Sequence, residues 1–102
     1  MKRLSFLPKA EARLEDISEW TVLHFGPIQA ESYVADLLDR CRAVAEGTAH
    51  TQSCRAVFAP DLREDLRFAR AGQHFVVFIE TAAEIVVVDF IHQRADLPGK
   101  LG

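Results

Sequence analysis

Cysteine is scarce in this sequence, and no long apolar run occurs. The two cysteines, Cys41 and Cys54, do not make a disulfide framework, and no CxxC or histidine-rich spacing predicts a metal site. We therefore expect the reducing cytoplasm as the compartment, and neither a metal nor another cofactor. The apolar segment at residues 4–7 is too short for a signal peptide or a membrane span, so a membrane is not an expected partner.

Positive charge is also in short supply. Lys and Arg number 12 against 15 Asp and Glu, which gives a formal net charge of -3. Phosphate backbones attract basic surfaces, so this balance weighs against direct, specific binding of nucleic acid. The length of 102 residues, with 49% hydrophobic and 26% charged residues, predicts a single globular domain over residues 1–102. Such a small domain has a thin margin of stability, so a protein partner is expected.

Apolar residues recur every three or four positions in two stretches, residues 9–24 and residues 28–46. This period predicts two amphipathic helices. Gly26 suits the turn that closes the first helix, Pro27 suits the first turn of the second, and Gly47 suits the end of the second. We therefore expect an antiparallel helical hairpin whose apolar stripes are covered by the rest of the chain or by a partner.

Short runs of β-branched and aromatic residues surround the hairpin. Residues 4–7 predict an N-terminal strand that stops at Pro8. Three further strands, joined by short turns, are predicted at residues 66–70, 73–80 and 84–92. Residues 48–60 show no period and are predicted to be a loop, in which a helical turn is compatible with the sequence. The expected fold class is α+β, with an N-terminal strand, a helical hairpin and a three-stranded antiparallel meander packed on the helices.

The order of these elements, together with particular residues, resembles the ParE/RelE toxin superfamily over nearly the whole chain, and the ParE branch most. In the hairpin the residues that carry the resemblance are Ala10, Leu14, Ile17, Trp20, Phe25, Gly26, Gln29, Ala30, Tyr33 and Leu37. In the sheet and carboxyl end they are Arg70, Gly72, His74, Phe78, Ile91, His92, Gln93, Arg94 and Asp96. The resemblance lies in their joint order and spacing.

This resemblance implies the toxin of a bacterial type II toxin-antitoxin system. Such a toxin inhibits growth, is neutralised in a hetero-oligomer by a ParD-like antitoxin, and in the ParE branch characteristically poisons DNA gyrase. Inhibition by binding implies that the chain is not an enzyme. A decayed toxin that serves mainly as a scaffold for its antitoxin in operator repression is a further possibility.

The alternative is a RelE-like endoribonuclease that cleaves messenger RNA on the ribosome. Its chemistry requires a base, cations and an acid, for which the candidates are Arg67, Arg70, His92 and Arg94. The tyrosine expected near the carboxyl end is missing, since the sole tyrosine, Tyr33, lies in the second predicted helix. Arg67 and Arg70 are three residues apart and are expected on opposite faces of a strand. His92 is expected to bind backbone at a strand end rather than to act as a base.

Six residues are the candidate contacts to the antitoxin: Trp20, Leu23, Phe25, Arg67, Arg70 and Arg94. For the three large apolar residues, burial in the core is the favoured alternative, because a binding role requires exposure. For the arginines, the alternative is a solvated side chain or a salt bridge. Cys41 is expected to be buried in its helix, whereas Cys54, in a polar loop, is a candidate for an exposed thiol.

Overall fold

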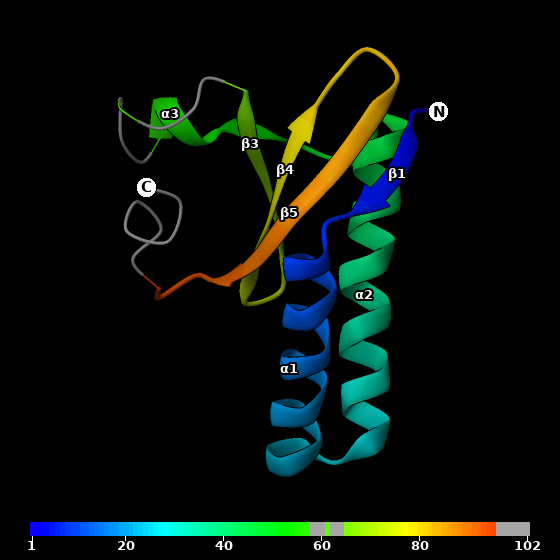
Figure 1. Cartoon of the computed structure of the whole chain (residues 1–102). Coiled ribbons are helices and arrows are strands. Elements are labelled where there is room, and N and C mark those ends of the chain that lie inside the picture. The colour runs from blue at the N-terminus through cyan, green and yellow to red at the C-terminus, as the bar shows by residue number, and fades with distance from the viewer. Residues whose placement is uncertain (58–60, 62–64, 96–102) are drawn as a thin grey trace.

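The structure is a computed structural model that describes residues 1–57, 61 and 65–95. Two long antiparallel helices lie against one face of a twisted sheet, and the helical pair extends well past the end of the sheet (Figure 1). The α+β class expected from the sequence is confirmed. Asp96, one of the residues in the family resemblance, lies outside the described residues.

The two helices are α1, Pro8–Phe25, and α2, Pro27–Glu46. Each begins at a proline, because the first helical turn does not need the N–H that proline lacks and accepts its fixed φ. Pro27 therefore lies in the first turn of α2 as the sequence predicts, whereas α1 begins one residue earlier than predicted. Gly26 joins them with φ of 91°, a conformation that a residue with a side chain rarely adopts. The predicted hairpin is confirmed. No helix of the described segments combines the length and apolar character needed to cross a membrane.

The sheet contains the predicted meander of three strands, β3 at Leu66–Ala71, β4 at His74–Glu80 and β5 at Glu84–His92. The N-terminal strand β1, Arg3–Phe6, joins this sheet by pairing in parallel with β5, which the sequence did not predict. The strand order is β1-β5-β4-β3-β2, so the sheet is mixed. The crossover from β1 to β5 includes the whole helical hairpin, which places both helices on one face of the sheet (Figure 1).

The segment predicted to be a loop holds short regular elements. Strand β2, Gln52–Ser53, pairs with β3, and one helical turn, α3, follows at Cys54–Val57. Cys54 is fully buried there, so the prediction of an exposed thiol is wrong. Its side chain packs with Leu66 and Phe68 on the sheet face opposite the long helices. Burial raises the pKa of the Cys54 thiol to about 11, which keeps it protonated at neutral pH.

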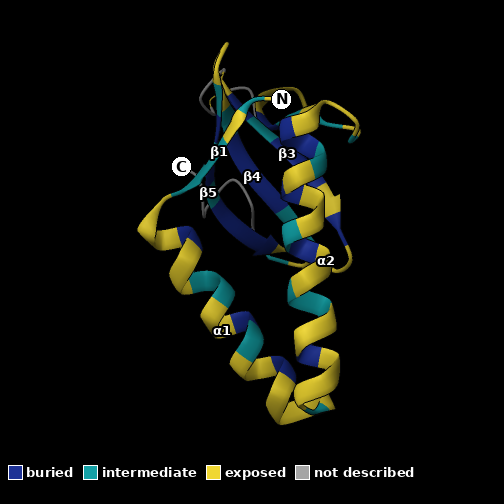
Figure 2. Ribbon diagram, turned by 90° about the vertical axis from the view of Figure 1, so that its right-hand side faces the viewer, coloured by how far each residue is buried: buried dark blue, intermediate teal, exposed yellow. Residues whose placement is uncertain are grey.

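Two apolar clusters hold the chain together, one on each face of the sheet. The inner cluster joins the hairpin to the sheet through residues such as Leu37, Phe78 and Phe90. Cys41 lies in this cluster with no exposed surface, as the sequence predicts. Figure 2 shows that buried residues concentrate in the strands and the adjacent helical turns, while the far end of the hairpin is mostly exposed. The hairpin is therefore anchored at one end only.

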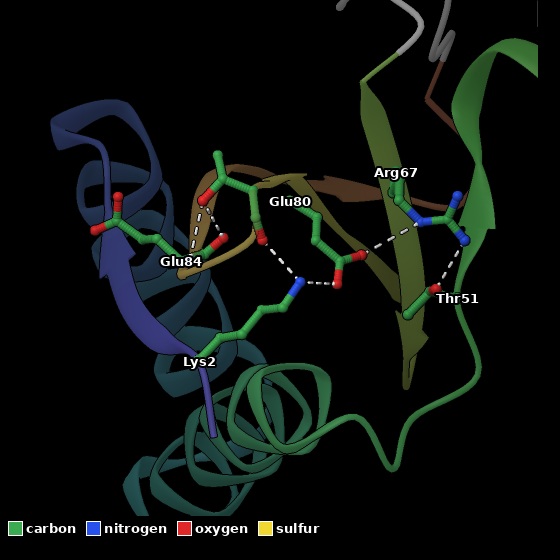
Figure 3. A network of polar contacts seen from close by, with 6 residues as sticks. Lys2, Thr51, Arg67, Glu80 and Glu84 are labelled. Atoms are coloured by element: carbon green, nitrogen blue, oxygen red, sulfur yellow. Dashed lines mark hydrogen bonds and ion pairs between the residues drawn. The ribbon is translucent and has the colours of Figure 1, made fainter.

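A network of polar contacts lies at the end of the sheet opposite the hairpin tip (Figure 3). Lys2 Nζ lies 2.6 Å from Glu80 Oε2, and Arg67 Nε lies 3.8 Å from Glu80 Oε1. Arg67 also donates to Thr51 Oγ1 at 2.9 Å. The network joins the amino terminus, β4, β3 and the segment before β2, so Arg67 acts here as a structural cation.

Candidate partner-binding groove

An open cavity of about 660 Å³ lies between the hairpin and the adjacent ends of β4 and β5. We call it the hairpin groove. The residues that line it are Arg13, Asp16, Ile17, Trp20, Thr21, Phe25, Gln29, Tyr33, Gln73, His74, Phe90, Ile91, His92 and Ala95. Its size is that of a site for a drug-sized ligand or a short peptide segment. It exists because α1 and α2 run past the sheet while the chain returns along β4 and β5.

Large aromatic side chains form the outer wall of the groove. Trp20 is 55% exposed and Phe25 is 57% exposed, and their ring centroids lie 6.0 Å apart. Trp20 also stacks on His24 at 4.0 Å, and His24 Nδ1 lies 2.8 Å from the Trp20 carbonyl oxygen. The expected burial of Trp20 and Phe25 in the core is wrong, because the sheet ends before it reaches this part of α1.

Leu23 corrects the sequence interpretation in the same way. It is 82% exposed at the tip of the hairpin and does not line the groove. Ile28, which the sequence analysis did not single out, is 85% exposed at the start of α2. A monomer rarely exposes so many large apolar side chains on one element. The hairpin end therefore has the composition of a contact surface.

Tyr33 and His74 form the polar floor of the groove. The Tyr33 hydroxyl lies 2.6 Å from His74 Nδ1 and accepts the backbone N–H of Gln73 at 3.0 Å. Burial raises the pKa of Tyr33. Burial, with added repulsion from His92 and Arg13, lowers the pKa of His74 to about 4, so its ring is neutral at pH 7.

His92 ends β5 beside this pair. Its Nδ1 accepts the backbone N–H of Arg94 at 3.1 Å, and its ring meets the His74 ring edge-on at 5.2 Å. The expectation that His92 binds backbone at a strand end is confirmed. His24 likewise binds backbone, whereas His74 contacts the side chain of Tyr33.

A buried carboxylate lies behind the groove. Asp89, in β5, has no exposed surface and accepts Arg13 Nε at 3.1 Å and the backbone N–H of Phe90 at 2.8 Å. Lys9 Nζ lies 3.5 Å from the second carboxylate oxygen. The sequence analysis did not single out Asp89 or Arg13. The available signal was a lone carboxylate inside an apolar strand, which requires a charged partner from elsewhere in the fold.

Of the four residues named for RNA cleavage, Arg70, His92 and Arg94 lie at one end of the sheet and Arg67 lies at the other. In the strand register His74 pairs with His92, while Arg67 pairs with Phe78, four residues further along β4 and roughly 13 Å away. Arg70 pairs with Phe75, which packs against the outer cluster, so Arg70 faces away from the helices as the spacing predicts. Arg67 and His92 therefore lie at opposite ends of the sheet.

Arg70 and Arg94 lie near the groove end of the sheet without lining the groove. Arg70 donates to Gln93 Oε1 at 2.5 Å and to the Gly72 carbonyl oxygen at 3.2 Å. Arg94 is exposed, and its side chain has no partner among the described residues. Of the six candidate antitoxin contacts, only Trp20 and Phe25 line the groove. Within the described part of the chain, no group of three or more potential metal ligands occurs.

Comparison with known proteins agrees with this architecture. The sequence profile described as "ParE toxin of type II toxin-antitoxin system, parDE" matches residues 4–97. Toxin ParE1 of Mycobacterium tuberculosis is 33% identical over 95 residues, which cover 92% of each protein. A solved chain titled "Chromosomal ParDE TA system from P. aeruginosa" has the same fold, with a TM-score of 0.69 at 22% identity over 90% of this chain and 96% of that one. This chain belongs to the ParE toxin family of type II toxin-antitoxin systems.

Proposed function

We propose that this protein is a growth-inhibiting toxin that acts in the cytoplasm by binding DNA gyrase and is neutralised by a ParD-like antitoxin seated in the hairpin groove. Family membership supports the role of toxin. It also supports gyrase as the target, because ParE toxins characteristically poison this enzyme. The observation that carries the antitoxin site is the groove itself, with Trp20 and Phe25 more than half exposed on its wall.

The groove fits a peptide segment better than a flat protein surface. It is partly open to solvent, and both large apolar side chains and polar groups on Tyr33, His74 and His92 line it. An amphipathic segment matches such a groove, because its apolar side chains pack on the wall and its polar side faces the floor or solvent. Large aromatic side chains of this kind contribute most of the affinity in many interfaces.

The arrangement of the candidate catalytic residues favours inhibition by binding over RNA cleavage. Arg70 lies at the same end of the sheet as His92 but faces away from the helices, whereas His92 pairs with His74 on the helix side. Arg67 is held in the network with Glu80 and Thr51, far from His92. His92 uses Nδ1 for backbone, and its nearest ring neighbour is the neutral His74 rather than a carboxylate. A general base needs an orienting group and a nearby cation.

The test is expression of the toxin alone and together with the antitoxin gene found beside it. We expect growth arrest with the toxin alone, and both normal growth and a co-purifying complex when the two are expressed together. Primer extension on RNA from the arrested cells separates the alternative, because a RelE-like nuclease leaves cuts at fixed codon positions. Harmless expression of the lone toxin would instead favour a decayed toxin that serves as a scaffold.

A further inference from the structure

Three side chains that line the hairpin groove, Arg13, His74 and His92, present hydrogen-bond donors to it. Arg13 uses Nε for the buried carboxylate of Asp89, and neither of its Nη groups has a partner among the described residues. The Arg13 side chain is 37% exposed. Asp89 therefore holds the Arg13 guanidinium in one orientation through Nε. The four N–H groups on the two Nη atoms remain free to bind an occupant of the groove.

The two histidines on the groove floor are donors for a geometric reason. The backbone N–H of Arg94 can only donate, so His92 Nδ1 is the acceptor and the neutral ring carries its hydrogen on Nε2. The Tyr33 hydroxyl already accepts from Gln73, and His74 Nδ1 is the one acceptor within its reach in the described structure. Tyr33 therefore donates to His74, whose hydrogen also lies on Nε2. Neither Nε2 has a partner among the described residues.

An occupant that covers the groove removes water from these donors. Covering the free Nη groups of Arg13 without an acceptor is unfavourable, so the occupant must supply one. A carboxylate accepts two parallel hydrogen bonds from a guanidinium, and here it also balances the net positive charge of Lys9 and Arg13 around the single carboxylate of Asp89. Asp16, the one acidic residue among the described lining residues, lies one turn along α1 from Arg13 and disfavours further carboxylates in the groove beyond the one that Arg13 binds.

We infer that the groove recognises a segment of the antitoxin that places a single Asp or Glu against Arg13, flanked by large apolar side chains that pack on Trp20 and Phe25. This inference rests on the proposed function and specifies the chemistry of the partner. Arg13 is then a specificity residue, and Asp89 is the residue that positions it. Neither Arg13 nor Asp89 is among the six antitoxin contacts expected from the sequence.

The test is a double-mutant cycle between the toxin and the antitoxin encoded beside it, measured by isothermal titration calorimetry. The toxin variant is Arg13→Gln, and each Asp or Glu of the antitoxin is changed in turn to Asn or Gln. We expect Arg13→Gln to weaken binding at least about tenfold, and one antitoxin variant to do the same. The same antitoxin substitution should not weaken binding further to the Arg13→Gln toxin, because the ion pair is already absent there.

Arg42→Gln is the matched control. Arg42 is an exposed arginine of α2 that pairs with Asp39 at 2.5 Å and does not line the groove, so its loss should change affinity less than about threefold. Arg13→Gln leaves the buried Asp89 with Lys9 as its charged neighbour and so threatens folding. The combined variant Arg13→Gln with Asp89→Asn replaces the ion pair by two amides, and circular dichroism reports whether it is folded.

The outcomes separate the inference from the proposed function. If the antitoxin binds the toxin and no acidic residue couples to Arg13, the inference is wrong and the proposed function stands. If the antitoxin does not bind the unchanged toxin, both fail. If a single-stranded RNA oligonucleotide binds the toxin and Arg13→Gln abolishes that binding, the groove takes nucleic acid and the inference is overturned.

Discussion

At Gly72, in the turn between β3 and β4, the backbone has φ of +59° and passes directly over a side chain. A Cβ atom built there would lie 2.7 Å from Tyr33 Cε1. The glycine therefore serves two purposes, since it permits the left-handed conformation and lets the Tyr33 hydroxyl reach Gln73 and His74. This contact fixes the distance between α2 and the sheet on the groove floor.

We predict that Gly72→Ala lowers the free energy of unfolding by about 2 to 4 kcal/mol, from backbone strain together with displacement of Tyr33. Chemical denaturation measures it. Gly47→Ala is the control, because Gly47 also has positive φ, +80°, but open space where the Cβ would lie. Its cost should be about 1 kcal/mol. Equal losses for the two variants would mean that the Tyr33 contact carries no energy.

His74 gives the fold a pH dependence with a defined direction. Its pKa in the folded chain is about 4 against an ordinary 6.5, so the unfolded chain binds more protons between these two values. The free energy of unfolding should therefore fall as pH drops from 6.5 to 4, and be independent of this group above 6.5. After allowance for partial solvent screening, the loss is about 1 to 2 kcal/mol.

Chemical denaturation of the unchanged protein and of His74→Gln at several pH values between 4 and 7 measures the contribution of His74 to the free energy of unfolding. The difference between the two stabilities should shrink as pH falls, because only the unchanged protein loses the contribution of His74. Parallel curves would show that His74 is not shifted in the folded chain.

Single residues also mark where sequence reasoning fails. The sequence predicts a buried Trp20 and an exposed Cys54, whereas Trp20 is exposed and Cys54 is buried, and in both cases the tertiary fold decides the environment. Periodicity tells which face of a helix is apolar, but it does not tell how far the sheet extends beneath that face. Cys54 was taken for an exposed thiol because its neighbours are polar, although its own side chain faces strands more than ten residues away.

At the scale of elements, local patterns predicted the helical hairpin and the meander. Their bounds differ from the structure by at most one residue, because the helix period and the strand runs are encoded locally. The parallel pairing of β1 with β5 was not predicted, because residues 3–6 and 84–87 are far apart in the sequence and no local pattern records which strands pair. The groove depends on the same long-range geometry and so could not be predicted either.

The hairpin end should contribute to binding more than to folding. We predict that Trp20→Ala weakens antitoxin affinity about 30-fold and changes the free energy of unfolding by less than about 1 kcal/mol, because Trp20 is half exposed and lines the groove. Calorimetric titration and thermal denaturation measure the two effects.

Leu23→Ala is the matched control on the same helix. Leu23 is more exposed than Trp20 and lies outside the groove, so antitoxin affinity should change less than about threefold. A larger loss at Leu23 than at Trp20 would place the antitoxin on the hairpin tip rather than in the groove. The tip would then be unavailable to a target while the antitoxin is bound.

At the scale of the whole molecule, the chain divides into a packed sheet with its polar network and a projecting hairpin (Figures 1 and 2). Composition predicted a small acidic domain that depends on a partner, and the exposed apolar hairpin end agrees with that expectation. The target of the toxin is not encoded in any motif that composition or periodicity reveals. Gyrase is proposed as the target on the basis of family membership alone, and the proposal requires a direct test.

That test is to express the toxin alone in bacterial cells and to measure gyrase trapped on cleaved DNA, with antitoxin co-expression as the control. We predict that covalent gyrase-DNA complexes accumulate as growth stops, and that the antitoxin prevents both. Growth arrest without trapped gyrase would contradict the account and direct attention to ribosomal messenger RNA or to another target.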